Sequence, residues 1–535
     1  MIKLLAAALL ITFSWSANGQ TVTGPMGERF AARVVASKLS DPWEITYGPD
    51  NQLWVTESKG YLVSRIDPAS GKRTVILDLN TERKFPRYDK LGKASGGKPW
   101  PQGGLMGMAL HPQLLNGKPF VYLMYVYAFS GADKDGSGCA DKFGGCRFWG
   151  RIVRYEYSKS TEKLIKPVIL CDTIPQSNDH NGGRLVLAPA GDKLYLFYST
   201  GDMGAGQFGN AGQPNRAQLK TSYEGKILRF NTEADQDRDA FDKWIPNDNP
   251  FNAPRQSAVW SYGHRNPQGL AYAKINGSGR LFQSEHGPFS DDEINIIEKS
   301  GNYGHPLVIG YADGNYDGLA ASASEHAALP GKWNTTYPLI VSEKENAAGM
   351  GKTYHDPIIS LYPNSAELLA RLYEERLEGK DDQQWPSEAP SSLEVYTATA
   401  IPGWRNSLLV PTLKGNKLIR LKLDEEGKRI VGDTISYFRN KVRYRDIAIS
   451  PDGRKIYLAI DSTAASSNPA KEKPETIYHP GSIMEFFYLG AASGQEPVSK
   501  QTHHRENKNK NAPERSARAR DTTAIIPRSE QSPKR

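Results

Sequence analysis

The chain has 535 residues, of which 38% are hydrophobic, with 50 glycines and 35 prolines. This composition supports a large core, but it has too many turn-forming residues for an architecture of long helices. The formal net charge is +8 at pH 7, yet ten Lys/Arg and four Asp/Glu, net +6, lie in residues 500–535. Because the rest of the chain is close to neutral, the charge argues against a nucleic-acid-binding protein.

The N-terminus has the layout of a cleavable export signal. Lys3 precedes an apolar run from Leu4 to Phe13, and small residues follow up to Gly19. We therefore expect residues 1–19 to be a signal peptide and the mature chain, beginning near Gln20, to be periplasmic or secreted. No later stretch approaches about 18 apolar residues, so we expect no transmembrane segment.

Six segments share one pattern: a short β-rich run, a turn built on Pro, Asp, Asn or Gly, and a second run with aromatic and β-branched residues. This pattern is typical of a β-hairpin. The predicted hairpins are Ile45–Thr56, Met108–Tyr125, Leu185–Tyr198, Leu270–Gln283, Gly403–Pro411 and Ile447–Ile460.

A further alternating strand follows several of these hairpins. These strands are Leu62–Ile66, Ile152–Tyr157, Lys226–Phe230, Leu418–Leu423 and Ile483–Tyr488. Units of four strands around a channel are the blades of a propeller. We therefore predict that residues 20–489 form an all-β domain, a six-bladed β-propeller of four-stranded antiparallel blades. A large β-sandwich or barrel is the alternative, because the repeats are unequal in length.

Cysteines occur at three positions. Cys139 and Cys146 bracket a glycine-rich loop and could form a small disulfide in an oxidising compartment. Cys171 would then be a free thiol, and we expect it to be buried and inert.

His180 lies in a loop directly before the hairpin that starts at Leu185, and that hairpin ends in Thr200-Gly201-Asp202. A histidine titrates near neutral pH, and a carboxylate behind it fixes its tautomer and stabilises its charged form. The pair therefore suggests a general base and its orienting group. A structural histidine is the alternative.

Polar residues also flank the hairpin that starts at Leu270. Arg265 and Asn266 precede it, and the turn Gly287-Pro288 follows it. Carbonyl oxygens of such a turn suit calcium, and the acidic residues 291–293 lie close by in sequence. An ordinary Gly-Pro turn is the alternative.

Three further cations follow the later strands. Lys414 comes just after one strand, and Arg443 and Arg445 lie two residues apart on an extended segment. If they converge with Arg265, they suit a compact ligand with several carboxylates. If they do not, they are ordinary surface charges.

Residues 490–535 are predicted to form a disordered basic tail, because they are almost free of large apolar residues. The tail is either a solvated extension without a role or a segment that contacts an anionic membrane surface or a partner protein.

In this order, the residues resemble the soluble glucose and sorbosone dehydrogenases, a quinoprotein family with a six-bladed propeller. The resemblance runs from about Leu39 to Tyr488. It implies oxidation of a glucose-like aldose at the anomeric carbon to the lactone, dependent on pyrroloquinoline quinone (PQQ) and Ca²⁺. Hydride would pass to PQQ and electrons then to an external acceptor.

The resemblance also implies roles for individual residues. His180 would be the base and Asp202 its orienting group. The sugar-binding residues would be Gln102, Asp179 and Gln207. Those that bind the quinone would be Arg265, Asn266, Trp385, Ser387, Lys414, Arg443 and Arg445.

Two calcium sites are implied as well. The carbonyls of Gly287 and Pro288 would hold the catalytic ion. A second, structural ion would bind Glu293, Asp313 and the carbonyls of Tyr303, Ile309 and Tyr311, with an acid from Glu343 or Glu345. The region around the second ion lies near a dimer contact in the family, so a homodimer is implied.

The chain departs from the family pattern beside the calcium loop, at His286, and near the sugar pocket. His286 stands in place of a glutamine, Asp382 in place of an aromatic residue, and Ser387 in place of a threonine. The disulfide expected just before Trp385 is absent from the sequence. Two other functions stay open: a calcium-dependent sugar lactonase, and a propeller that only binds sugars or proteins.

Overall fold

The computed structural model describes residues 20–80, 103–130, 147–177, 179–206, 210, 213–236, 242–321, 326–327, 333–334, 338–378, 380, 385–462 and 478–491. Several predictions lie outside these residues: the signal peptide, the Cys139–Cys146 disulfide, the tail beyond Ala491, and the positions Gln102, Gln207 and Asp382.

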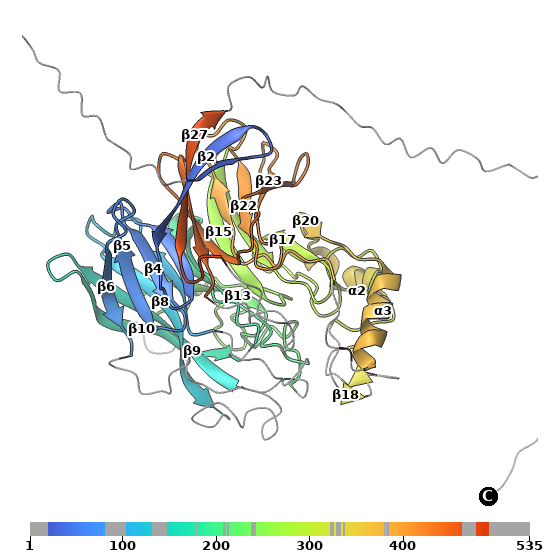
Figure 1. Cartoon of the computed structure of the whole chain (residues 1–535). Helices are drawn as coiled ribbons and strands as arrows, with labels where there is room; N and C mark the ends of the chain where they lie inside the picture. The colour runs from blue at the N-terminus through green and yellow to red at the C-terminus, as the bar shows by residue number, and fades with distance from the viewer. Residues whose placement is uncertain are drawn as a thin grey trace, which may run out of the picture. The chain divides into compact units, whose positions relative to one another are not determined.

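The first three blades are four-stranded antiparallel sheets built from consecutive strands (Figure 1). The first blade comprises β3 (Pro42–Tyr47), β4 (Leu53–Glu57), β5 (Leu62–Ile66) and β6 (Arg73–Asp78). The second comprises β7 (Leu105–Leu110), β8 (Phe120–Ser130), β9 (Arg147–Ser158) and β10 (Lys163–Gln176). The third comprises β11 (Leu185–Ala190), β12 (Lys193–Thr200), β13 (Lys226–Asn231) and β14 (Val259–Tyr262).

The fourth and fifth blades repeat this order, and the last blade uses both ends of the described chain. The fourth comprises β15 (Pro267–Ile275), β16 (Ser278–Glu285), β17 (Asp292–Ile296) and β20 (Ile359–Leu361). The fifth comprises β21 (Glu394–Tyr396), β22 (Ser407–Pro411), β23 (Leu418–Lys422) and β24 (Ile435–Tyr437). The last comprises β25 (Tyr444–Ile449), β26 (Lys455–Ile460), β27 (Ile483–Ala491), β2 (Glu28–Ala36) and β1 (Gln20–Thr23).

The ring closes where the N-terminal strand β2 pairs with the C-terminal strand β27, Phe30 opposite Tyr488. The first strands of successive blades neighbour one another all the way around the axis. Aromatic side chains fill the space between the last two blades, where the rings of Phe438 and Phe486 stack with centroids 3.8 Å apart. Burial of each such side chain stabilises the fold by about 1.5–3 kcal/mol.

The predicted six-bladed propeller is therefore confirmed, and most of its turns follow the expected chemistry. Between β15 and β16, Asn276 and Gly277 have φ values of 47° and 84°, as a two-residue type I′ turn requires. The predicted hairpin Gly403–Pro411 is wrong. Its first strand is β21, Glu394–Tyr396, and residues 403–406 form a turn. A strand of three residues is too short to show the alternation on which the prediction relied.

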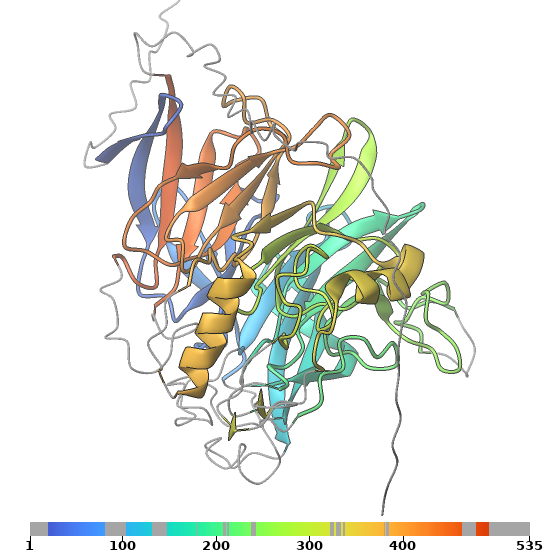
Figure 2. The same cartoon turned by 90° about the vertical axis from the view of Figure 1, so that its right-hand side faces the viewer.

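The long segment between β17 and β21 carries the helices α2 (Glu343–Met350) and α3 (Ala366–Leu377). It also contains the short elements β18 (His326–Ala327), β19 (Trp333–Asn334) and η3 (Gly351–Thr353). Figures 1 and 2 show both helices at the periphery, beside the blade of β17 and β20. Among the described residues, no helix is long and apolar enough to cross a membrane.

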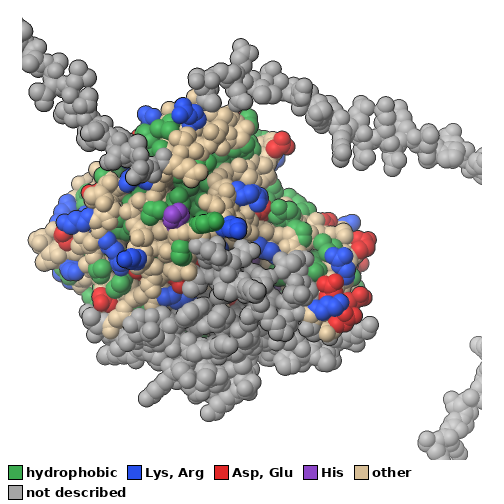
Figure 3. Space-filling model, in the orientation of Figure 1, with side chains coloured by type: hydrophobic (Ala, Val, Ile, Leu, Met, Phe, Trp, Pro, Cys, Tyr) green, Lys and Arg blue, Asp and Glu red, His purple; other side chains and the backbone are tan. Residues whose placement is uncertain are grey.

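The face drawn in Figure 3 carries basic and acidic side chains in mixture, with charges of both signs around α3. Two ion pairs account for part of this region: Arg371 with Glu375 at 3.9 Å and Lys380 with Glu378 at 2.9 Å. Cys171, on β10, is a half-buried free cysteine, and burial raises the pKa of its thiol.

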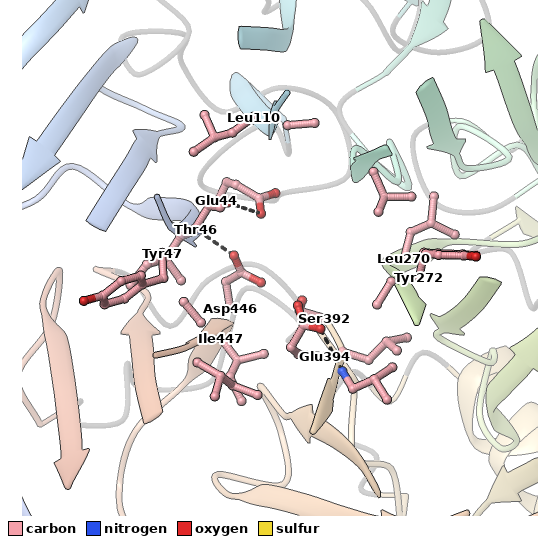
Figure 4. A pocket seen from close by; sticks show the side chains of 18 of the residues that line it. Glu44, Thr46, Tyr47, Leu110, Leu270, Tyr272, Ser392, Glu394, Asp446 and Ile447 are labelled. Atoms are coloured by element: carbon pink, nitrogen blue, oxygen red, sulfur yellow. Dashed lines mark hydrogen bonds between the residues drawn. The ribbon is translucent and has the colours of Figure 1, made fainter. Parts of the chain in front are cut away.

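The inner strands of the six blades enclose a cavity of about 460 Å³ on the propeller axis (Figure 4). Its lining reaches the C-terminal ends of these strands, as Tyr47 on β3 and Ile449 on β25 illustrate. The predicted base His180 precedes the start of an inner strand instead. The cavity and the candidate site therefore lie toward opposite ends of the axis.

Candidate active site

The loop that carries His180 is packed tightly against the end of β12. His180 itself has a left-handed backbone, with φ of 46°, and its side chain is buried. The backbone N–H of Met203 reaches the His180 carbonyl oxygen at 3.4 Å. A Cβ atom on Gly201 would collide with that same oxygen, so only glycine permits this approach. The Thr200-Gly201-Asp202 turn thus brings the carboxylate back to the histidine.

The structure places Oδ1 of Asp202 2.7 Å from Nδ1 of His180. Burial alone would raise the pKa of Asp202, but the charge of His180 and the hydrogen bonds from His180 and His305 outweigh it and lower the pKa well below its ordinary value. Asp202 is therefore ionised, and an ionised carboxylate only accepts hydrogen bonds. Nδ1 of His180 must be the donor, which leaves its Nε2 available to accept a proton.

Two partners of Asp202 were not foreseen from the sequence. His305 Nε2 lies 2.9 Å from Oδ2 of Asp202, and the Asn215 side-chain amide donates to the same oxygen at 3.0 Å. His305 lies 103 residues beyond Asp202 in the chain. Its neighbours Gly304 and Pro306 suggest only a turn, so no local pattern signals this contact.

Asp179 is buried beside the base. Its Oδ1 accepts from the backbone N–H of His180 at 3.1 Å and lies 3.9 Å from Nε2 of that ring. A carboxylate at this distance from the proton-accepting nitrogen lies where a substrate hydroxyl could contact both groups. The other two predicted sugar-binding residues, Gln102 and Gln207, lie outside the described part.

Arg265 and Asn266 lie between the base and the Gly-Pro turn. Nη1 of Arg265 donates to the carbonyls of His286 at 3.2 Å and Gly287 at 3.0 Å. Oδ1 of Asn266 accepts from the backbone N–H of Gly182 at 3.3 Å, two residues beyond the base. These bonds join the fourth blade to the loop of the third that carries His180.

Arg443 and Arg445 share one buried carboxylate at the start of β25. Arg445 donates from Nε and Nη2 to the two oxygens of Asp461 at 2.9 and 2.8 Å, and Nε of Arg443 lies 3.7 Å from Oδ2. Arg445 also donates to Oε1 of Gln268 at 3.3 Å, and Gln268 donates to Asn266 at 2.8 Å. The last blade is thereby connected to the fourth blade at the site.

Lys414 and Trp385 form a second connection to the Gly-Pro turn. Nζ of Lys414 donates to the Trp385 carbonyl at 2.7 Å and lies 3.9 Å from the centre of its indole ring. Trp385 packs edge-on against Phe289, with ring centroids 4.9 Å apart. Trp385 therefore packs within the protein, between a cation and the turn.

The predicted cations converge rather than scatter over the surface. Burial, with the nearby charges of Arg265, His180 and Arg445, lowers the pKa of His286 to about 3. His286 thus lies among charged groups from the third, fourth and last blades. Its Nε2 is 3.0 Å from the carbonyl oxygen of Pro390, at the start of the fifth blade. Planar guanidinium groups brought together in this way suit a ligand with several carboxylates, so the residues fit PQQ.

The turn at Gly287 and Pro288 is held by a buried acid. Asp292 accepts from the backbone N–H of Gly287 at 3.2 Å, from the Ser387 hydroxyl at 2.8 Å and from the backbone of Glu388 at 2.8 Å. Its oxygens are therefore engaged in positioning loops. Among the described residues, no group of three or more His, Cys, Asp or Glu side chains is placed to hold a metal ion. A cation at this turn would depend on carbonyl oxygens, which calcium accepts.

The predicted residues of the second calcium site also lie together. Glu293 is buried and accepts from the backbone N–H of Gly310 at 2.9 Å. Of the two acids left open, Glu343 accepts from the backbone N–H of Ile309 at 2.9 Å, whereas Glu345 is exposed. Burial raises the pKa of Glu343 to about 7 and that of Glu293 well above its ordinary value. A buried carboxylate is unfavourable in its charged form, so each of these two acids favours a nearby cation or a proton.

Three other residues of this set lie on the same loop. The Tyr311 carbonyl accepts from the backbone N–H of Asp313 at 2.8 Å. The Tyr303 carbonyl accepts from the backbone N–H of His305 at 3.1 Å, so this loop also carries the second partner of Asp202.

A buried arginine separates this site from the axial cavity. Nη1 of Arg184, in the third blade, donates to Glu44 at 2.5 Å and lies 3.0 Å from Asp446. Its other nitrogens donate to the carbonyls of Gln268 at 3.2 Å and Ser391 at 3.3 Å. One side chain thus connects five blades across the axis. It also reaches the cation-bearing network through Gln268.

Comparison with known proteins supports the interpretation built from these contacts. A model of the glucose/sorbosone dehydrogenase family matches residues 39–355 and 346–467. Quinoprotein glucose dehydrogenase B of Acinetobacter calcoaceticus is 34% identical over 520 residues, which are 91% of this chain and 98% of that protein. An aldose sugar dehydrogenase of Escherichia coli is 26% identical over 443 residues, 82% of this chain and 92% of that protein.

Solved structures agree on the fold. The PQQ-bound form of an aldose sugar dehydrogenase from Streptomyces coelicolor is similar with a TM-score of 0.53 and 23% identity, over 87% of this chain and 100% of that one. Together these findings define the class, a six-bladed β-propeller oxidoreductase. The chain belongs to the glucose/sorbosone dehydrogenase family, as its sequence motifs predicted.

Proposed function

We propose that this protein oxidises an aldose at the anomeric carbon to the lactone, in a reaction dependent on PQQ and Ca²⁺, and passes the electrons to an external acceptor. The observation that carries the proposal is the buried pair of His180 and Asp202, 2.7 Å apart, beside converging guanidinium groups. The 34% identity to a quinoprotein glucose dehydrogenase supports the same chemistry.

His180 acts as the general base. Its Nδ1–H donates to Asp202, so Nε2 takes the proton from the anomeric hydroxyl, and the ionised Asp202 stabilises the imidazolium that forms. Asp179 binds the sugar next to Nε2, at 3.9 Å, and Gln102 and Gln207 complete the sugar contacts. Asp202 keeps its charge throughout because its pKa is held low.

The quinone is held by residues from the fourth, fifth and last blades. Arg265, Asn266, Lys414, Arg443 and Arg445 would bind its carboxylates and carbonyls, and Trp385 and Ser387 would add further contacts. The carbonyls of Gly287 and Pro288 hold the catalytic calcium. Bound PQQ supplies the hydride acceptor, and calcium supplies a Lewis acid that polarises a carbonyl.

The remaining features are assigned on the same basis. A second, structural calcium binds Glu293, Asp313 and the carbonyls of Tyr303, Ile309 and Tyr311, with Glu343 as the additional acid. The chain is exported to the periplasm or secreted after loss of residues 1–19, and it forms a homodimer.

One experiment tests this function. The purified chain, reconstituted with PQQ and Ca²⁺, should reduce a redox dye with at least one member of a panel of aldoses. His180→Ala should keep quinone affinity but lose turnover by about 10²- to 10⁴-fold, since that is the usual contribution of a general base. The matched control is His111→Ala, a buried histidine of the second blade.

Three results would contradict the proposal. If the chain does not bind the quinone, it is not a PQQ-dependent dehydrogenase. Hydrolysis of sugar lactones without dye reduction favours the lactonase, and sugar binding that is unaffected by His180→Ala, without turnover, favours a binding protein.

A further inference from the structure

Both oxygens of Asp202 are fully used by hydrogen-bond donors. Oδ1 accepts from His180 Nδ1 at 2.7 Å and from the backbone N–H of Gly204 at 2.9 Å. Oδ2 accepts from His305 Nε2 at 2.9 Å and from the amide of Asn215 at 3.0 Å. The base therefore belongs to a chain of two histidines joined by one carboxylate.

His305 is fixed in this position by its own backbone. Its N–H donates to the Gly263 carbonyl at 3.0 Å, and its carbonyl accepts from the Gln218 side chain at 2.8 Å. The ring is buried, and Asp202 only accepts, so Nε2 of His305 carries the proton that Asp202 receives. The side-chain amide of Asn215 is also held in place, because its Oδ1 accepts from the backbone N–H of Ala217 at 3.0 Å. Its Nδ2 therefore points to Oδ2 of Asp202.

We propose that His305 is a positioning residue for the base: by donating from Nε2 to Oδ2 of Asp202, it fixes the plane of the carboxylate that orients His180 and limits the basicity of His180. A carboxylate that accepts a second strong hydrogen bond is a weaker partner for an imidazolium. The catalytic part of this inference rests on the proposed function, because it takes His180 as the base.

Other charged groups also face His180. Asp179 lies 3.9 Å from its Nε2, and His180 interacts through space with His286 and with His305. Exchanging His305 leaves Asp179 and His286 in the chain, but it also removes a neighbour of Asn215, whose Nδ2 lies 3.2 Å from Nε2 of His305. The test therefore needs one variant that loses the donor and one that keeps it.

The test compares His305→Phe, which keeps a ring but removes the donor, with His305→Gln, whose amide can donate from a similar position. The first readout is the NMR titration of His180 in the full chain without added quinone. His305→Phe should raise the pKa of His180 by about 0.5–1 unit, and His305→Gln should bring it back toward the original value.

The second readout is turnover of the chain reconstituted with PQQ and Ca²⁺. His305→Phe should lower kcat about 10-fold with KM changed less than about 2-fold, since orientation of a base acts on the chemical step. His305→Gln should recover most of kcat. His111→Gln serves as the control for replacing a buried histidine and should alter neither readout.

The inference is overturned if His305→Phe leaves the titration of His180 unchanged. It is also overturned if both variants lose kcat in equal measure with their melting temperature, since that pattern marks a purely structural residue. If the original chain fails to oxidise any aldose but the titration responds as expected, the proposed function fails and the link between His305 and His180 stands.

Discussion

The two ends of the propeller axis arrange their charged groups differently on the same scaffold. At the cavity end, the carboxylates Glu44, Glu394 and Asp446 line the cavity (Figure 4), and Arg184 lines it as well. At the His180 end, Arg443 and Arg445 share a single carboxylate, Asp461, beside further cations.

The two ends differ in how their buried charges are paired. At the cavity end, the guanidinium of Arg184 pairs with two buried carboxylates, Glu44 at 2.5 Å and Asp446 at 3.0 Å. At the other end, Arg443 and Arg445 share Asp461, and the charges of Arg265 and Arg445 both act on His286. Removing one partner of a buried ion pair is strongly destabilising, whereas guanidinium groups that meet at one place suit a ligand with several carboxylates.

The largest expected effect comes from breaking the internal pairing. Arg184→Met leaves Glu44 and Asp446 as uncompensated buried charges and should lower the free energy of unfolding by about 3–5 kcal/mol. Chemical denaturation of the full chain measures this loss. A variant that also carries Glu44→Gln and Asp446→Asn should recover most of it, and a loss of less than about 1 kcal/mol for Arg184→Met would show that the pairing is unimportant.

A smaller effect should appear in the pH dependence of stability. Burial and the neighbouring Asp446 raise the pKa of Glu394 to about 7. Between its ordinary value and about 7, the folded state therefore holds a proton that the unfolded state has lost, and stability falls as pH rises. Glu394→Gln should make this slope less steep by at most about 1.4 kcal/mol per pH unit in denaturation curves from pH 5 to 8. An unchanged slope would exclude Glu394 as its source.

The smallest effect on stability is expected at the end of the axis that carries His180 and Arg445. Arg445→Lys keeps the charge but loses the two-pronged contact with Asp461, so quinone affinity should fall about 10-fold while unfolding changes little. Calorimetric titration of PQQ into the calcium-loaded chain measures the affinity. Arg429→Lys, an exposed position elsewhere on the fifth blade, is the control. If Arg445→Lys and Arg429→Lys bind PQQ with equal affinity, Arg445 does not contact the quinone.

Much of the fold was predictable because its signals are local. The turn at Asn276 and Gly277 depends on neighbouring residues alone, and so do the short runs of apolar residues in β5, β13 and β23. The one misplaced hairpin had a first strand of three residues, Glu394–Tyr396, which is shorter than any reliable period. Pairing of β2 with β27 was not foreseen, since nothing near Phe30 indicates a partner more than 450 residues away.

In the candidate site, too, some features follow from local sequence and others only from the folded structure. The sequence by itself determined which residues could do chemistry, because His180 and Asp202 border one hairpin and the cations follow family motifs. Only the tertiary structure decided how they act together. His305 and Asn215 reach Asp202 from other segments, and Arg184 joins five blades across the axis. Such contacts form when the ring of blades closes, and a pattern confined to a few adjacent residues cannot report that closure.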